Sequence, residues 1–218
     1  MSERGERTAR DEVLGRIRAA TRGGPQPAEV PRGYRSAGGF PPGAPELIDL
    51  LVRRLVDYRA TVHRCGPDGL PAAVAAALAG ASAVAVPPGV ADGWLAAWTG
   101  PVSTDLRLPG LAVLTGCAVA IAPTGTIILD AGPAQGRREL SLVPDHHVCV
   151  VHAGQVAASV PAALARLADP ARPLTLISGP SATSDIELNR VEGVHGPRRL
   201  DVVLVAAGRS SPAPPARA

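Results

Sequence analysis

Short apolar segments alternate with helical patterns over most of this chain. The predicted strands lie at residues 61–64, 82–86, 111–114, 118–122, 127–129, 147–152, 174–178 and 201–206. The predicted helices cover residues 46–60, 71–79 and 155–167, with one helical turn at 138–143. Strands rich in Val, Ile and Leu are typical of a parallel sheet covered on both faces. Because the spacing around residues 123–126 suits a hairpin, we expect an α/β fold with a mostly parallel, mixed sheet.

Two of these helices are predicted from apolar residues at helical spacing. In the segment 46–60 the apolar face consists of Leu47, Leu50, Leu51 and Leu55. In the segment 155–167 it consists of Val156, Val160, Leu164 and Leu167. Residues three or four positions apart share one side of a helix, so each of these faces is expected to be buried.

The N-terminal part of the chain differs from the rest in composition. Residues 9–22 predict a short helix with Val13, Leu14 and Ile17 on one face. Of the 23 residues from 23 to 45, 12 are Gly or Pro, which excludes a regular element there. We therefore divide the chain into an N-terminal helix and arm (1–45), a main domain (46–207) and a Pro-rich, disordered tail (208–218).

Composition and charge exclude several functions. All 22 basic residues are Arg, so chemistry that needs a catalytic lysine or a P-loop lysine is impossible. The net charge of +3 is scattered and aromatic residues make up only 2% of the chain, so we expect no nucleic-acid binding. No apolar segment reaches 18 residues without interruption, and therefore no transmembrane segment is expected.

The cysteines point to a reduced compartment and to no cofactor in this chain. Cys65, Cys117 and Cys149 are isolated and odd in number, which is unlike a disulfide framework or an iron–sulfur motif. The N-terminal residues are charged where a signal peptide would be apolar. A cytoplasmic location is therefore expected.

Three polar loops follow apolar strands, and ligands of α/β proteins bind beyond such strand ends. The first is Thr124-Gly125-Thr126, whose hydroxyls and backbone amides suit an anion. The same three residues also suit a simple turn in which the threonines satisfy nearby backbone groups. Both interpretations stay open from the sequence.

The second loop, residues 130–139, ends in paired arginines. Arg137 or Arg138 would clamp a carboxylate or phosphate, unless one pairs with a neighbouring acid and the other is solvated. His146 and His147 follow on a predicted strand, where adjacent side chains face opposite sides. Since they cannot share one ion there, we expect no metal site. A role for one of them as acid or base stays open beside a structural role.

The third loop runs from Ile177 to Pro197. Its donors are Ser181 and Thr183, and the pattern beginning at Ser184 fits the capped start of a helix. Asp185 lies on the first turn of that helix, and His195 follows between glycines within reach of the same place. A capped helix without a ligand explains the pattern as well. The three loops together predict one anion site, with no residue assigned as catalytic.

Two long segments resemble a known family. They read TGCAVAIAPTGTIILDAGPAQGRRELSLVPDHHVCVV (115–151) and ISGPSATSDIELNRVEGVHGPRRLDVVLV (177–205), and both closely resemble the LutC branch of the lactate-utilisation (LUD) family. PRGYR at 31–35 and RRLVDYRATVHR at 53–64 look like the N-terminal half of the same family. One departure is Pro123, which stands where the family commonly carries Glu.

The resemblance implies a fold, a process and partners. The implied fold is a three-layer α/β sandwich like that of the NagB/RpiA/CoA-transferase superfamily. The implied process is the oxidation of L-lactate to pyruvate by a three-part system. In that system iron–sulfur clusters are expected in the LutA-like and LutB-like partners, and this chain is expected to be a non-redox subunit or accessory protein.

Two other functions compete with this expectation. In the first, the chain is an independent enzyme of the superfamily that acts on an anionic small molecule such as a phosphosugar, a folate, a nucleotide or a CoA ester. In the second, it is a module that binds such a molecule. A CoA transferase needs a nucleophilic Glu on a loop at a strand end, and Pro123 removes one such position. Whether the chain is itself an enzyme stays open at this point.

Overall fold

The protein is described by a computed structural model over residues 9–24, 33, 39–169, 171–183, 191–192 and 196–207. The chain separates into two compact units, residues 1–34 and 35–218, and each is described by itself. In the first unit the predicted helix is present as α1 (Ala9–Thr21), with Asp11 and Glu12 in its first turn and Arg18 in its last. This charge order suits the helix dipole. Val13 and Ile17 are exposed on α1.

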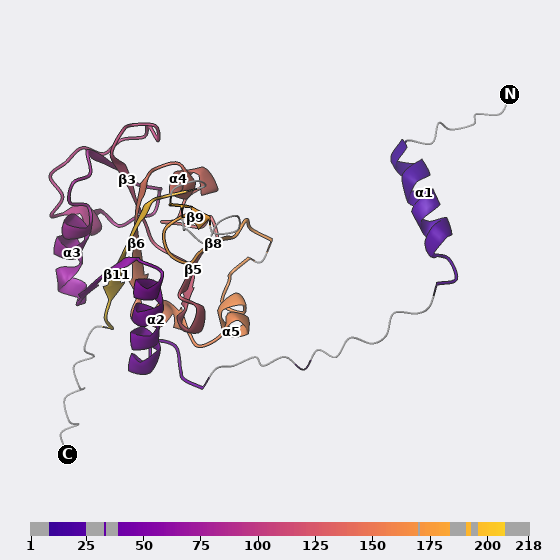
Figure 1. The fold of residues 1–218 in the computed structure, drawn as a ribbon, viewed down its shortest axis with the longest axis horizontal. Helices are drawn as coiled ribbons and strands as arrows, with labels where there is room; N and C mark the ends of the chain where they lie inside the picture. Colours follow the sequence, from indigo (N-terminus) through magenta and orange to yellow (C-terminus); the bar gives the residue numbers. More distant parts are fainter. Residues whose placement is uncertain are drawn as a thin grey trace, which may run out of the picture. The chain divides into compact units, whose positions relative to one another are not determined.

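The second unit is built on a parallel sheet of five strands (Figure 1). The strands are β1 (Thr61–Cys65), β2 (Ala83–Ala85), β3 (Leu111–Thr115), β6 (His146–His152) and β11 (Arg199–Val205), in the order β1-β11-β6-β3-β2. Every neighbouring pair in this sheet is parallel. Since a parallel sheet must be covered on both faces, nearly all residues of the strands β2, β3, β6 and β11 are buried.

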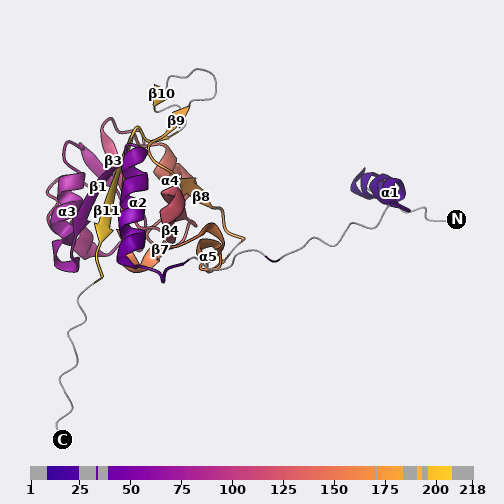
Figure 2. The same cartoon turned by 60° about the horizontal axis from the view of Figure 1, so that its bottom comes forward.

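One face of this sheet packs against the helix α3 (Leu70–Ala77). Leu70, Val74 and Ala77 of α3 are buried against alternate residues of the strands, among them Val150 and Val203. The side chains of Trp94 and Trp98 pack at the margin of the same cluster, beside the 3-10 helix η2 (Asp92–Leu95). Figure 2 shows α3 on one side of β1 and β11, with α2 on the other.

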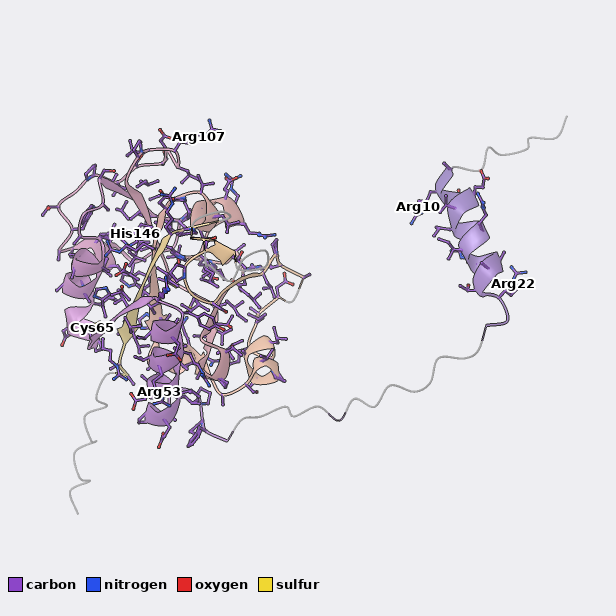
Figure 3. All side chains as sticks on the ribbon, viewed as in Figure 1. Arg10, Arg22, Arg53, Cys65, Arg107 and His146 are labelled. Atoms are coloured by element: carbon purple, nitrogen blue, oxygen red, sulfur yellow. The ribbon has the colours of Figure 1, made fainter. Side chains whose placement is uncertain are left out.

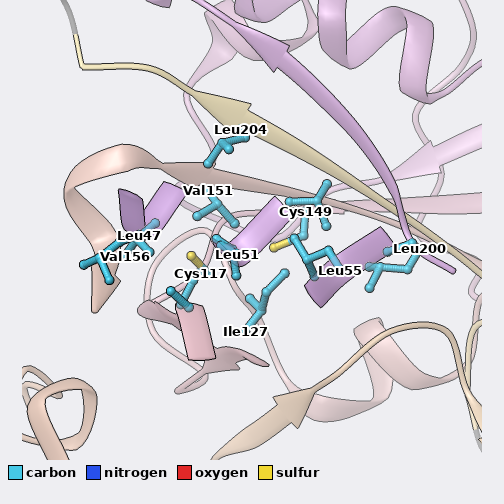
Figure 4. Close-up of a cluster of buried hydrophobic side chains, with 14 of the residues drawn as sticks. Leu47, Leu51, Leu55, Cys117, Ile127, Cys149, Val151, Val156, Leu200 and Leu204 are labelled. Carbon is cyan, nitrogen blue, oxygen red and sulfur yellow. The ribbon is translucent and has the colours of Figure 1, made fainter. Parts of the chain in front are cut away.

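The opposite face is covered by α2 (Pro45–Asp57) and by a second sheet. This sheet contains β4 (Val119–Ile121), β5 (Thr126–Leu129), β7 (Val156–Ala157) and β8 (Thr175–Ile177), in the order β7-β4-β5-β8. Leu47, Leu51 and Leu55 of α2 pack against Ile127 and Cys149 from the two sheets (Figure 4). The expected α/β class is confirmed, and the expected antiparallel strands β4 and β5 lie in this second sheet, which is mixed because β4 and β7 are parallel.

Two short helices complete this side. The helix α4 (Arg138–Leu142) corresponds to the predicted helical turn, and Leu140 packs beside Leu111 and Val113 of β3. The helix α5 (Val160–Leu164) buries Ala163 against the outer face of the second sheet.

The helix predicted over 155–167 is wrong at its start, and Val160 and Leu164 of its expected buried face are exposed. The chain forms a 3-10 turn, η4 (Ala153–Gln155), and then the strand β7 before α5 begins. Val156 is buried in the core and pairs with Ala120 of β4, so its apolar side chain belongs to a strand. Ser159 starts the true helix, because its Oγ accepts a hydrogen bond from the Ala162 amide at 3.2 Å. Tertiary pairing has here overridden a helical pattern.

A two-stranded ladder lies near the C-terminal part of the unit. The strands β9 (Ala182–Thr183) and β10 (Val191–Glu192) pair in antiparallel fashion. The helix start predicted from Ser184 lies outside the described residues. Two further 3-10 turns are η1 (Pro67–Gly69) and η3 (Ala122–Thr124).

Candidate functional site

The loop of residues 130–137 forms hydrogen bonds with residues just beyond the carboxyl ends of β2 and β3. The amide of Ala134 donates a hydrogen bond to the carbonyl of Pro88, beyond β2, at 2.9 Å. The carbonyl of Ala134 accepts from the amide of Gly116, beyond β3, at 2.7 Å. The loop therefore lies at the sheet edge where α/β proteins bind ligands.

Buried polar groups hold this loop in an unusual conformation. The Asp130 amide donates to Oε1 of Gln135 at 2.6 Å, and Oδ1 of Asp130 accepts from the Gly132 amide at 2.9 Å. Both side chains are buried. Ala131 and Ala134 have φ values of 56° and 62°, a backbone conformation that residues other than glycine rarely adopt. Such strain persists only where the surroundings fix it, and it concentrates at functional loops.

Beside this loop lies a pocket that we call the arginine pocket. Its volume is about 430 Å³, and it is lined by Pro88, Gly89, Ala131, Gly132, Pro133, Gly136, Arg137 and Arg172. Among these described lining residues the two arginines are the only charged ones. Guanidinium groups bind carboxylates and phosphates through paired hydrogen bonds. The pocket is therefore suited to an anion.

A second pocket, the hydroxyl pocket, lies between α4 and β8 and has a volume of about 270 Å³. Its polar side chains are those of Ser141, His147, Thr175, Ser178 and Ser181, and none of the described residues that line it is charged near pH 7. Ser181 is held in place through its amide, which donates to the carbonyl of Pro197 at 2.8 Å. This pocket offers hydrogen bonds without a counter-charge.

The predicted Thr124-Gly125-Thr126 turn reaches the hydroxyl pocket through a chain of hydroxyls. Oγ1 of Thr124 lies 2.8 Å from Oγ1 of Thr126, which lies 2.9 Å from Oγ of Ser178. Gly125 has a φ of 61°, and a Cβ there would meet Cβ of Arg54 at 2.7 Å. Nε of Arg54 also donates to the carbonyl of Pro123 at 3.1 Å. The helix α2 thus covers the turn, and the threonine hydroxyls bond to other hydroxyls rather than to the nearby backbone groups of a simple turn.

The adjacent histidines face opposite sides of β6, as strand alternation predicts. Nε2 of His147 lies 2.7 Å from Oγ1 of Thr115 on the side of the hydroxyl pocket. Burial, together with the charge of His146, lowers the pKa of His147 from 6.5 to about 4. His147 is therefore neutral near pH 7 and acts there as a hydrogen-bonding group rather than a cation.

His146 belongs to a separate cluster on the α3 side of the sheet. Asp201, which is fully buried, accepts hydrogen bonds from the side chains of His63, His146 and Arg199. Arg199 also donates to the carbonyls of Ala77 and Ala79, at the end of α3. His146 lies inside the unit, whereas Arg53 and Arg107 lie at its surface (Figure 3). Within the described residues, no group of three or more His, Cys, Asp or Glu side chains could hold a metal ion.

The nine predicted ligand-binding residues are distributed over different places. Thr124, Gly125, Thr126 and Ser181 lie at or next to the hydroxyl pocket, whereas Arg137 lines the arginine pocket. Arg138 begins α4, is exposed and lines neither pocket. The backbone of Thr183 is part of β9, and Asp185 and His195 lie outside the described residues.

Sequence reasoning missed Arg172 and gave no specific role to Ser178. Arg172 lies in a Pro-rich segment after α5 that follows no predicted strand, so no local pattern indicated it. Ser178 ends an apolar strand directly before Gly179, and this placement was the available signal for it.

Comparisons with known proteins identify relatives of this chain. Residues 111–205 match the family described as the LUD domain. The protein named lactate utilization protein C from Deinococcus radiodurans is 47% identical over 169 residues, covering 73% of this chain and 80% of that protein. A lactate utilization protein C from an Exiguobacterium species is 32% identical over 110 residues, 47% of each chain.

A solved structure supports the same relationship. The crystal structure of a DUF162 family protein from Deinococcus radiodurans superposes with a TM-score of 0.63 at 42% identity. The match covers 74% of this chain and 97% of that chain.

No helix among the described residues has both the length and the apolar composition that a membrane crossing requires.

Proposed function

This chain belongs to the lactate utilization protein C family of LUD-domain proteins, and from that membership we propose that it is a non-redox component of an L-lactate-oxidising system. The observation that carries the proposal is the 47% identity to a protein of that name over 80% of its length. The proposed process converts L-lactate to pyruvate. The electrons pass through iron–sulfur clusters of LutA-like and LutB-like partners, in the cytoplasm.

The three cysteines of the chain support a role without a cluster of its own. Cys117 and Cys149 are buried, and Cys65 is partly exposed. Cys117 and Cys149 interact with each other, and their side-chain hydrogen bond together with burial raises the pKa of Cys117 well above its ordinary value. Metal ligation requires thiolates, so the raised pKa of Cys117 disfavours it as a metal ligand.

The proposed component also binds an anionic small molecule. Support comes from the arginine pocket, where Arg137 and Arg172 line one cavity at the carboxyl edge of the parallel sheet. An independent enzyme that acts on such an anion is the second candidate function, and the same pocket favours it. The two candidates differ in whether the chain needs its partners.

Deletion of the gene in its own organism tests the role in lactate oxidation. We expect growth on L-lactate as sole carbon source to be lost, growth on glucose to be unchanged, and an intact copy of the gene to restore growth on lactate. Tagged full-length chain should also co-purify with the two iron–sulfur partners. Normal growth of the deletion strain on L-lactate would contradict the proposal.

A further inference from the structure

The arginine pocket opens beside another cavity, which we call the side pocket. The side pocket has a volume of about 340 Å³ and shares Pro88, Gly136 and Arg137 with the arginine pocket. Its other walls include Ser103, Thr104, Leu106, Glu139 and Leu140. Arg137 thus stands at the boundary between a cationic cavity and one that offers hydroxyls, apolar surface and a single carboxylate.

Among the described residues, both arginines pair with exposed acidic side chains. Arg137 pairs with Glu139, and Nε of Arg172 lies 3.8 Å from Oδ2 of Asp169. All four side chains are at least two-fifths exposed. Exposed ion pairs are weak because water screens them and the side chains lose freedom on pairing. A multivalent anion that accepts from both guanidinium groups therefore competes well with these partners.

Asp130 is a further acidic group near the arginine pocket, and it is already engaged. It is buried, and its Oδ1 accepts from the Gly132 amide at 2.9 Å. A Cβ on Gly132 would lie 2.7 Å from that oxygen and 3.1 Å from Nη1 of Arg172. The glycine therefore lets the loop close over the Asp130 carboxylate and lets Arg172 approach its backbone.

We propose that the arginine pocket binds the phosphate group of a phosphate monoester, whose hydroxyl-bearing organic part lies in the side pocket. This inference builds on the anionic ligand of the proposed function and goes beyond it, because lactate is small and carries one negative charge. A phosphate monoester carries close to two negative charges at pH 7, which match Arg137 and Arg172. In the side pocket, Glu139 repels a second anion, whereas its carboxylate and the hydroxyls of Ser103 and Thr104 suit hydroxyl groups.

Calorimetric titration of the purified full-length chain tests the proposal with four probes. They are glycerol 3-phosphate, inorganic phosphate, glycerol and L-lactate, which separate the phosphate group from the organic part. We expect glycerol 3-phosphate to bind most tightly, inorganic phosphate to bind more weakly, and glycerol and L-lactate to bind weakest of all.

Substitutions locate the two parts of the ligand. Arg137→Ala and Arg172→Ala should each weaken the binding of glycerol 3-phosphate roughly tenfold to a hundredfold, since each removes charge-assisted hydrogen bonds. Arg53→Ala is the matched control, because Arg53 is an exposed arginine on α2 that lines neither pocket. Thr104→Val should weaken the binding of glycerol 3-phosphate and leave that of inorganic phosphate unchanged.

The proposal is overturned if neither phosphate probe binds, or if the Arg137 and Arg172 variants bind as the Arg53 variant does. It is also overturned if L-lactate binds more tightly than glycerol 3-phosphate. Each result is separate from the role in lactate oxidation. Loss of growth on lactate together with no phosphate binding would keep the proposed function and remove this inference, and normal growth with phosphate binding would do the reverse.

Discussion

Nε2 of His146 lies 2.9 Å from Oδ2 of Asp201, across the neighbouring strands β6 and β11 of the parallel sheet. Burial by itself raises the pKa of the Asp201 carboxyl. Hydrogen bonds from His146, His63 and Arg199, with the charge of Arg199, outweigh burial and lower that pKa from 3.8 to about 2. The cluster thus keeps a fully buried carboxylate ionised at the centre of the sheet.

Asp201→Asn should destabilise the protein by about 3 kcal/mol near pH 7, because it leaves buried donors without their charged partner. A lowered carboxyl pKa gives stability that is present above about pH 4 and is lost as the pH falls toward 2. The free energy of unfolding of the wild type should therefore fall in that window, on the order of 2 kcal/mol, more steeply than that of the variant. Urea unfolding at several pH values measures both effects.

Asp49→Asn is the control for this experiment. Asp49 pairs with Arg64 at 2.5 Å, but both side chains are about half exposed. Removal of an exposed ion pair should cost less than about 1 kcal/mol. An equal loss of stability in the Asp49 and Asp201 variants would contradict the importance given to burial of the cluster.

His147→Gln should flatten the pH dependence of stability between about pH 6.5 and 4. The lowered pKa of His147 means that the unfolded chain takes up a proton in this window before the folded chain does. Stability of the wild type therefore falls as the pH decreases from 6.5 to 4. The variant keeps a hydrogen-bonding group for Thr115 without titrating there. Thermal unfolding measured across this range would refute the assignment if both proteins showed the same slope.

Gly125→Ala should destabilise the protein by about 1–3 kcal/mol. Its φ of 61° disfavours a side chain, and the new Cβ would lie 2.7 Å from Cβ of Arg54 on α2. Gly154→Ala is the matched control, because no atom lies within 4 Å of a Cβ there and its φ is not positive. Chemical denaturation of both variants tests the packing of the turn under α2. A stable Gly125→Ala protein would show that the turn can move away from this helix.

Removal of residues 1–38 should leave the thermal unfolding temperature of the second unit nearly unchanged. The truncation keeps the hydrogen bond from the Gly43 amide to the carbonyl of Val156, at 3.2 Å, and keeps α2 whole. We expect it to weaken association with the partner proteins, because the exposed Val13 and Ile17 of α1 offer an apolar face for contact. Co-purification of the truncated and full-length chains measures this effect, and loss of cooperative unfolding would contradict the expectation.

The purified chain should be colourless and should show no redox activity of its own. None of its three cysteines lies in a CxxC pattern, and among the described residues no cluster of metal-ligating side chains is present. An absorption spectrum of protein purified without air is the measurement. A stoichiometric iron–sulfur or flavin spectrum would disprove the non-redox role, whereas LutB-like partner protein prepared in the same way serves as a positive control.

The hydrophobic pattern of the chain was enough to predict the α/β class, most strand positions and the buried face of α2. Leu47, Leu51 and Leu55 are spaced at the period of a helix, and this spacing of apolar residues predicts which side chains are buried. Strand alternation likewise separated His146 from His147. The Thr124-Gly125-Thr126 turn and the loop of residues 130–139 were found because they follow apolar strands, which is a local signal.

Which of these groups contact one another depends on the folded arrangement of distant segments. In the fold, Arg137 and Arg172 line one pocket, and the hydroxyls of Thr126 and Ser178 form a hydrogen bond. His63 and His146 both lie within hydrogen-bond distance of Asp201. The fold also makes Val156 part of a strand where the local pattern favoured a helix. The physical reason is the same in each case: the hydrophobic pattern shows which side chains turn inward, and contacts between distant segments determine what they meet.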